Sequence, residues 1–172
     1  LHKEYRRQRQ MCIRDRGNYD MRKIFDNTIV KDFPEQAVTF VDNHDSQPGQ
    51  GLESWVEDWF KEIAYALILF RKDGYPCIFA GDYYGLCGPV KTDPLEEMIN
   101  NMISVRKNYN YGDQDDYFDD PSVIGWVRRG DDEHKPLAVL ISIKDMAEKQ
   151  MHVGESEAVS YTHLTLPTIL LV

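Results

Sequence analysis

Two short apolar runs separated by a long amphipathic stretch constrain the fold most strongly. The runs at 37–41 (AVTFV) and 75–80 (YPCIFA) have the length and the β-branched or aromatic content of buried strands. Between them, apolar side chains recur at the spacing of one helix face: Trp55, Val56, Trp59, Phe60, Ile63, Ala64, Leu67 and Ile68. Two strands joined by a helix form a βαβ unit, in which the strands are parallel. The sequence therefore predicts an α/β fold, either a doubly wound sheet or a (β/α) barrel.

Local signals predict where the first helix begins and ends. Ser54 and Glu57 have the spacing of a capping box, which predicts that the helix begins at this point. Gly74 follows Arg71 and Lys72 and predicts the end of the helix.

A loop and a second helix are expected after the second run. The loop is 81–88 (GDYYGLCG), and the helix is expected to be capped by Asp93, with Pro94 in its first turn and Glu96 completing the pattern. Its apolar face comprises Leu95, Met98, Ile99, Met102 and Ile103.

The pattern changes to successive strands from about residue 117. The segments 122–129 (SVIGWVRR), 136–143 (PLAVLISI) and 149–154 (KQMHVG) read as strands, and 130–135 (GDDEHK) reads as a turn. A run of strands after βα units predicts a separate, smaller β domain.

Charge and hydropathy narrow the classes of partner. The net charge of −9 argues against a nucleic-acid partner, which would need a basic face. No apolar run reaches about 18 residues, so no membrane segment is expected. Cys12, Cys77 and Cys87 lack the spacing of a metal or redox motif, and the sequence leaves the compartment open.

Polar residues follow both apolar runs. Asp42, Asn43, His44 and Asp45 come directly after the first run, and GDYYG (81–85) comes after the second. Functional groups in parallel α/β folds gather at the carboxyl ends of the strands. We therefore expect a site at this rim, with Asp42 and Asn43 bracing the strand end by hydrogen bonds.

Three stretches carry a resemblance to a known family. The segment FVDNHDSQPGQ (40–50) resembles the fourth sequence signature of the α-amylase family of glycoside hydrolases. The wider stretch 18–85 resembles the last part of the barrel of bacterial liquefying-type members, and YFDDPSVIGWVRRGD (117–131) resembles the start of their C-terminal β domain. The resemblance covers about 18–155.

This resemblance implies a fold and its divisions. Residues 18–116 would form the last two βα units of a (β/α)8 TIM barrel, and 117–155 would begin a C-terminal all-β domain. The two ends, 1–17 and 156–172, do not continue the pattern of their neighbours. They contain MCIRDR and VSYTHLTLPTILLV, which resemble peptides translated from sequencing-adaptor DNA. We expect both ends to be non-native and to lie outside the packed fold.

The resemblance also implies roles for individual residues. Asp45 matches the carboxylate that stabilises the transition state, and His44 matches the histidine that hydrogen-bonds the same sugar. Fixed negative charge suits an oxocarbenium-like transition state, and a neutral imidazole offers one donor and one acceptor. Asn43 and Tyr83 are candidate substrate contacts. Tyr83 and Tyr84 either stack on sugar rings or pack the loop.

The implied activity is the retaining hydrolysis of internal α-1,4-glucosidic bonds in starch, glycogen or maltooligosaccharides. The family places its nucleophile and its general acid after earlier barrel strands, so we expect this chain alone to be inactive and the full-length parent to be a monomer. One alternative is a non-catalytic carbohydrate-binding fragment. Another is an HD-type metal phosphohydrolase, which the positions of His134 and His152 in strand-like sequence disfavour.

Calcium is a further question for this chain. An acidic run could hold Ca²⁺ or form a solvated linker: Asp113, Asp115, Asp116, Asp119 and Asp120. The run lacks the ligand spacing of an EF-hand, and Pro121 and Ser122 stand where some relatives carry a His-Asp pair. No cofactor is expected in this stretch, and calcium is left open for the full-length parent.

Overall fold

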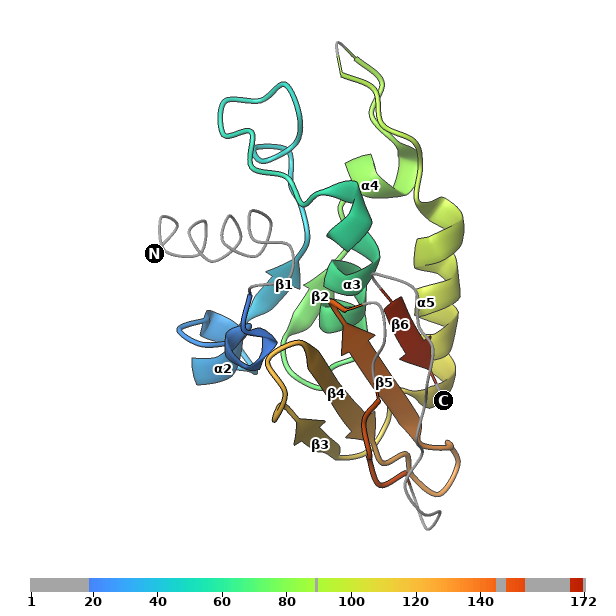
Figure 1. Cartoon of the computed structure of the whole chain (residues 1–172). Coiled ribbons are helices and arrows are strands. Elements are labelled where there is room, and N and C mark those ends of the chain that lie inside the picture. The colour runs from blue at the N-terminus through green and yellow to red at the C-terminus, as the bar shows by residue number, and fades with distance from the viewer. Residues whose placement is uncertain (1–18, 89, 145–147, 154–167, 172) are drawn as a thin grey trace.

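A computed structural model describes residues 19–88, 90–144, 148–153 and 168–171 of the 172-residue chain (Figure 1). Its elements, in chain order, are η1 (Met21–Lys23), α2 (Ile29–Asp32), β1 (Val38–Phe40), α3 (Asp58–Leu69), β2 (Tyr75–Cys77), α4 (Ala80–Tyr84), α5 (Glu96–Tyr109), β3 (Gln114–Tyr117), β4 (Val123–Arg128), β5 (Leu137–Ser142) and β6 (Thr168–Leu171).

The two apolar runs pair as the sequence predicts. β1 and β2 form a parallel pair in which Val38 lies opposite Tyr75 and Phe40 opposite Cys77. α3 is the crossover between them, and both strands are shorter than the runs that contain them. The predicted βαβ unit is therefore confirmed.

The expectation that the first apolar run forms a buried strand holds only in part, because one face of β1 is exposed. The side of the pair that carries Val38 and Tyr75 is open, with these residues 61 % and 75 % exposed. Ala37 and Val41, at the ends of the run, are buried. The reason is that, within the described residues, the sheet holding β1 has only the two strands β1 and β2.

The predicted start of the first helix is also wrong. α3 begins at Asp58 and has no side-chain cap. The Ser54 N–H donates to the Ser46 carbonyl at 3.0 Å, and the Val56 N–H donates to the Asp42 carboxylate at 3.2 Å. These bonds hold the segment against the end of β1 and keep it from continuing the helix.

The region around the second helix differs in two ways from the prediction. The segment predicted as a loop contains a short helix, α4. α5 begins at Glu96 with Leu95 as its N-cap, and no side chain caps it. The Leu95 N–H donates to the Asp82 carbonyl at 2.8 Å, so a contact with α4 sets the start of α5 in place of Asp93.

The remaining strands form one antiparallel sheet in the order β3-β4-β5-β6. β4 and β5 confirm the first two predicted strands, whereas 149–153 forms no strand of this sheet. β3 lies inside the acidic run and crosses the expected division between 116 and 117. In Figure 1 this sheet lies below the β1–β2 pair, and α5 runs alongside.

Part of the segment expected to lie outside the fold is paired. Within 156–172 the structure describes only β6, which pairs with β5, with Ile141 opposite Ile169. This pairing differs from the expectation for these four residues. The rest of 156–172 and all of 1–17 fall outside the described residues, and the proposed origin of both ends stays a prediction.

The two sheets share one hydrophobic core. One face of the β4–β5 hairpin packs into the cluster that contains α3 and α5, through Ile124, Trp126, Val139 and Ile141. The indole N–H of Trp126 donates to the Phe70 carbonyl, directly after α3, at 3.0 Å. The βαβ unit and the antiparallel sheet are therefore joined by continuous packing.

Arg71 strengthens this junction. Its guanidinium forms two hydrogen bonds with the Asp116 carboxylate, at 2.8 and 2.9 Å, and lies 4.5 Å from the centre of the Phe25 ring. It also lies near the rings of Phe118 and Trp126. A paired fork of this kind fixes orientation as well as distance.

Candidate functional site at the end of β1

The chain turns sharply after β1, and Asn43 organises the turn. The side-chain oxygen of Asn43 accepts the N–H groups of Asp45 at 3.0 Å and Ser46 at 2.9 Å. This is the Asx geometry by which a short amide side chain fixes the residues that follow it. The oxygen of Asn43 is therefore engaged with the backbone, as expected for a bracing role, and its substrate contact stays a prediction.

Asp42 holds the turn in place from its buried side. The residue is 2 % exposed, and its carboxylate accepts the Val56 N–H and the Ser46 hydroxyl, each at 3.2 Å. It also forms an ion pair with Lys61 at 3.2 Å. A buried carboxylate is stable only with such partners, and the predicted bracing role of Asp42 agrees with these contacts.

His44 and Asp45 lie on the open side of the same turn. Their side chains are 85 % and 61 % exposed, and His44 Nε2 lies 3.4 Å from Asp45 Oδ1. The structure thus brings together the two residues to which the sequence assigns chemistry. It presents a carboxylate and an imidazole to solvent, where a polar ligand could reach both.

Tyr83 is directed toward α5. Its hydroxyl lies 3.1 Å from Asn100 Oδ1 and 3.3 Å from Glu96 Oε1. Tyr84, next to it, is exposed, and the two rings meet edge to face at 4.7 Å. Tyr83 therefore packs α4 against α5, and its predicted contact with substrate stays a prediction.

Two residues of the site region were missed at the sequence level. Lys61 is buried and forms ion pairs with both Asp42 and Asp82, and the Tyr65 hydroxyl donates to Asp82 at 2.7 Å. Burial, together with the charge of Asp82, raises the pKa of the Tyr65 phenol and keeps it a donor. The available signal was the i, i+4 spacing of Lys61 and Tyr65, which places both on one side of α3.

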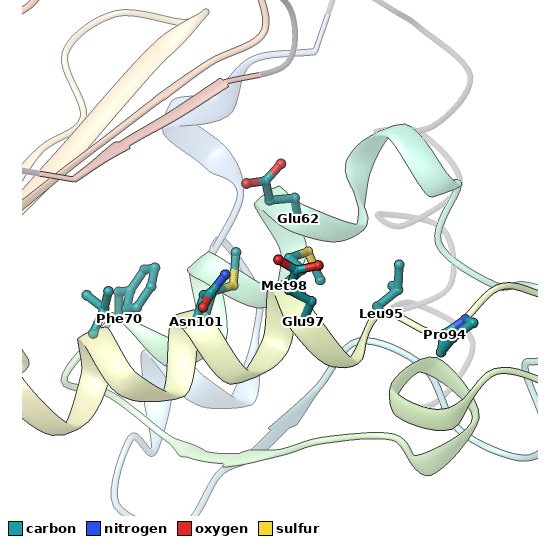
Figure 2. Close-up of a pocket in the computed structure, with 9 residues that line it drawn as sticks. Glu62, Phe70, Pro94, Leu95, Glu97, Met98 and Asn101 are labelled. Carbon is teal, nitrogen blue, oxygen red and sulfur yellow. The ribbon is translucent and has the colours of Figure 1, made fainter.

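Two cavities lie near these elements. One, of about 300 Å³, has Asp42, Lys61 and Asp82 among its lining residues. The other, of about 630 Å³, lies between α3 and α5, and Figure 2 shows the side chains that line it, including Glu62, Met98 and Asn101. Neither cavity is lined by His44 or Asp45, so the predicted site is an exposed turn beside the first cavity.

Four aspartates of the acidic run form ion pairs with lysine or arginine side chains. Asp113 pairs with Lys72, Asp115 with Arg129, Asp116 with Arg71 and Asp119 with Lys149. Asp120 accepts the N–H groups of Ser122 and Val123. Hydrogen bonds from Lys72 and Arg129 lower the pKa of Asp113 and Asp115, respectively. These pairs show that the run joins segments of the fold.

Among the described residues, no group of three or more His, Cys, Asp or Glu side chains could hold a metal ion. In the same part of the chain, no helix is long and apolar enough to cross a membrane. The metal sites considered for the HD pair and for the acidic run therefore have no ligand cluster in this part of the chain.

Comparison with known proteins identifies the family. The chain is 50 % identical over 146 residues to an α-amylase of Geobacillus stearothermophilus, a match that covers 83 % of this chain. The chain belongs to the α-amylase family. It is also 49 % identical to the glucan 1,4-α-maltohexaosidase of Bacillus sp. (strain 707), and 42 % identical to the cytoplasmic α-amylase of Escherichia coli K12, over 83 % and 81 % of this chain. No family profile matches the chain.

The α-amylase match concerns one part of those enzymes. The chain spans 26–30 % of the length of these three relatives. These matches establish the α-amylase family, and the mixed helices and strands are consistent with part of a TIM-barrel enzyme.

Proposed function

We propose that this chain forms part of an α-amylase that hydrolyses internal α-1,4-glucosidic bonds in starch, glycogen or maltooligosaccharides by a retaining mechanism. In this proposal β1 and β2 are neighbouring strands of a (β/α)8 barrel. His44 and Asp45 then lie at the carboxyl-end rim, where the active sites of such barrels are built.

One observation carries this proposal. An exposed His44–Asp45 pair follows a parallel strand, on a turn held by the side chains of Asp42 and Asn43. The stretch that contains it is half identical to an α-amylase. A fixed turn is what electrostatic stabilisation needs, because a preorganised charge does not have to reorient as the reaction proceeds.

The proposed roles follow from the chemistry of glycoside cleavage. The transition state resembles an oxocarbenium ion, and the carboxylate of Asp45 supplies negative charge beside it. His44 hydrogen-bonds hydroxyl groups of the same sugar. The nucleophile and the general acid are assigned to earlier barrel strands of the whole enzyme, so this chain alone is proposed to be inactive.

A second candidate function is carbohydrate binding without catalysis. Tyr84 is 72 % exposed and lies against Tyr83, and an exposed aromatic side chain offers an apolar face with a polar tip. On this alternative, maltohexaose binds the isolated chain and affinity falls in Tyr84→Ala. Isothermal titration with maltohexaose measures both.

The principal test is a graft. The stretch of the Geobacillus stearothermophilus α-amylase that this chain matches is replaced by the matching residues of this chain, and release of reducing sugar from soluble starch is measured. We expect the graft to be active and the isolated chain to be inactive. Asp45→Asn in the graft should lower this activity. Asp132→Asn, at an exposed site between β4 and β5, is its control and should leave activity unchanged.

Two outcomes contradict the proposal. A graft that folds, as judged by circular dichroism, but releases no sugar shows that these residues do not complete an α-amylase site. Activity of the isolated chain that survives re-purification and is lost in Asp45→Asn shows that the chain holds a complete site.

A further inference from the structure

Three buried charged groups bridge the ends of the two parallel strands, and the proposed chemistry uses none of them. Asp42 follows β1, Asp82 lies in α4 shortly after β2, and Lys61 of α3 reaches both. They are 2 %, 4 % and 8 % exposed, respectively. The Lys61–Asp42 distance is 3.2 Å, and Lys61 and Asp82 are in direct contact.

The position of Lys61 is unfavourable for the helix that carries it. It lies near the N-terminus of α3, which begins at Asp58. This end of a helix carries partial positive charge and disfavours a cation, and burial of an ammonium group adds a desolvation cost. Lys61 therefore does not contribute to α3 as an isolated helix, and its placement is explained by the two carboxylates that it joins.

Hydrogen bonds connect Lys61 to the exposed turn. Asp42, its partner, accepts the hydroxyl of Ser46 at 3.2 Å, and Ser46 Oγ accepts the N–H of Asn43 at 3.1 Å. The side chain of Asn43 in turn holds the N–H groups of Asp45 and Ser46. Each step joins adjacent polar groups of the same turn.

We propose that Lys61 is a positioning residue: by joining Asp42 to Asp82 it fixes the turn that carries Asp45 relative to the end of β2. This inference rests on the proposed function for its catalytic consequence, but its structural consequence can be measured without it. A displacement of about 1 Å at a reacting group can cost about 10²-fold in rate, so loosening this bridge should lower kcat.

Lys61→Met alone leaves two buried carboxylates without their cation, so a loss of activity in this variant would not distinguish misfolding from mispositioning. The paired variant Lys61→Met/Asp82→Asn avoids this, because removal of one cation and one anion keeps the net charge of the site. Asp42 keeps its bonds to Val56 and Ser46. Lys72→Met, at an exposed lysine that is paired with Asp113, is the matched control.

The first measurement uses the folded graft, whether or not it is active, because the isolated chain is expected to self-associate. Amide hydrogen exchange, read at single residues by mass spectrometry, reports the bonds that hold the Asp45 and Ser46 N–H groups. We expect faster exchange at these two amides in the paired variant, with the β4 and β5 amides unchanged, and no change in Lys72→Met. Unchanged protection at Asp45 and Ser46 overturns the proposal.

The second measurement uses the active graft. We expect the paired variant to lower kcat for a maltooligosaccharide by about 10- to 100-fold, with a smaller change in KM. The single variant Lys61→Arg keeps a cation at this position and should lower kcat less than the paired variant does. A merely structural role lowers the thermal midpoint but leaves kcat per folded molecule unchanged, and that result overturns the positioning role. If the unsubstituted graft is inactive, the proposed function fails while the exchange measurement still decides the role of Lys61.

Discussion

Asp42 and Asp45 are carboxylates of the same turn, and their positions in it give them different roles. Asp42 is buried and accepts hydrogen bonds from Val56 and Ser46, whereas Asp45 is exposed beside His44. A buried carboxylate with several donors acts as a structural anchor, and an exposed one remains free for a ligand. The same residue type therefore serves the fold at one position and the proposed chemistry at the other.

Asp45→Asn in the graft should lower kcat by about 10²- to 10³-fold, because the nearly isosteric amide removes a negative charge beside a developing cation. His44→Ala should have a smaller effect, since it removes sugar contacts and no required charge. Steady-state kinetics on one maltooligosaccharide compares the two variants, with circular dichroism as the folding control. Wild-type kcat in Asp45→Asn would show that Asp45 is only a strand-end residue.

At the residue scale, the sequence predicted where the polar turn after β1 lies, but it did not predict the buried hydrogen bonds and ion pairs beneath that turn. His44 and Asp45 could be found because they follow an apolar run directly. Lys61 could not be assigned a role, because its partners, Asp42 and Asp82, come from two other elements and become neighbours only in the folded chain.

At the element scale, Gly74 determines how β2 begins beside β1. It has a positive φ of 81°, and its N–H donates to the Pro34 carbonyl at 3.1 Å. A Cβ built at this position lies 2.7 Å from Thr39 Cγ2 and 3.0 Å from Val30 Cγ2. Both the backbone conformation and the surrounding space therefore favour glycine.

Gly74→Ala should destabilise the chain by about 1–3 kcal/mol, since alanine is strained at this φ and crowds Thr39. Urea unfolding followed by circular dichroism measures the change. Gly51→Ala is the matched control, because no atom lies within 4 Å of its built Cβ and its φ is not in the left-handed region. Equal stabilities of the two variants would contradict this account.

The elements themselves were predicted better than their boundaries. The β1–β2 pair and the β4–β5 hairpin follow from apolar runs, which are local signals. Both predicted helix caps failed, because tertiary bonds compete with local capping: the Val56 N–H binds Asp42, and the Leu95 N–H binds the Asp82 carbonyl. Contacts of this kind have no signature in a short window of sequence.

At the scale of the whole molecule, apolar surface remains open around β1 and β2. The exposed large apolar residues there are Ile29, Phe33, Val38 and Tyr75. Exposed apolar patches and unpaired strand edges favour association. In the proposed barrel, further strands would cover this surface.

The isolated chain should therefore self-associate at micromolar concentration, and Val38→Lys/Tyr75→Lys should reduce the association. Light scattering coupled to size-exclusion chromatography measures the mass of both. A monodisperse wild-type monomer with a cooperative thermal transition would count against this prediction.

The junction at Arg71 should contribute to global stability. Arg71→Met removes the paired fork to Asp116 and the contact with the Phe25 ring, and we expect a loss of about 1–3 kcal/mol, moderated because Asp116 is partly exposed. Thermal unfolding measures the loss. Arg129→Met, at an exposed pair with Asp115, should cost clearly less than Arg71→Met, because solvent screens exposed pairs. An equal loss in both variants would contradict the special role of Arg71.

The contact between Trp126 and the end of α3 has a consequence for recombination among related genes. An exchange point between α5 and β3 would separate Trp126 from the Phe70 carbonyl, and Arg71 from Asp116. A hybrid that inherits the two sides from different parents would keep the ion pair only where one parent supplies Arg71 and the other Asp116. It would keep the indole contact only where the second parent carries tryptophan at 126, since the acceptor is a main-chain carbonyl. Viable exchange points should therefore be rare in this interval, and more frequent in the exposed loop 130–135, where a crossover leaves both of these contacts within one parent's segment.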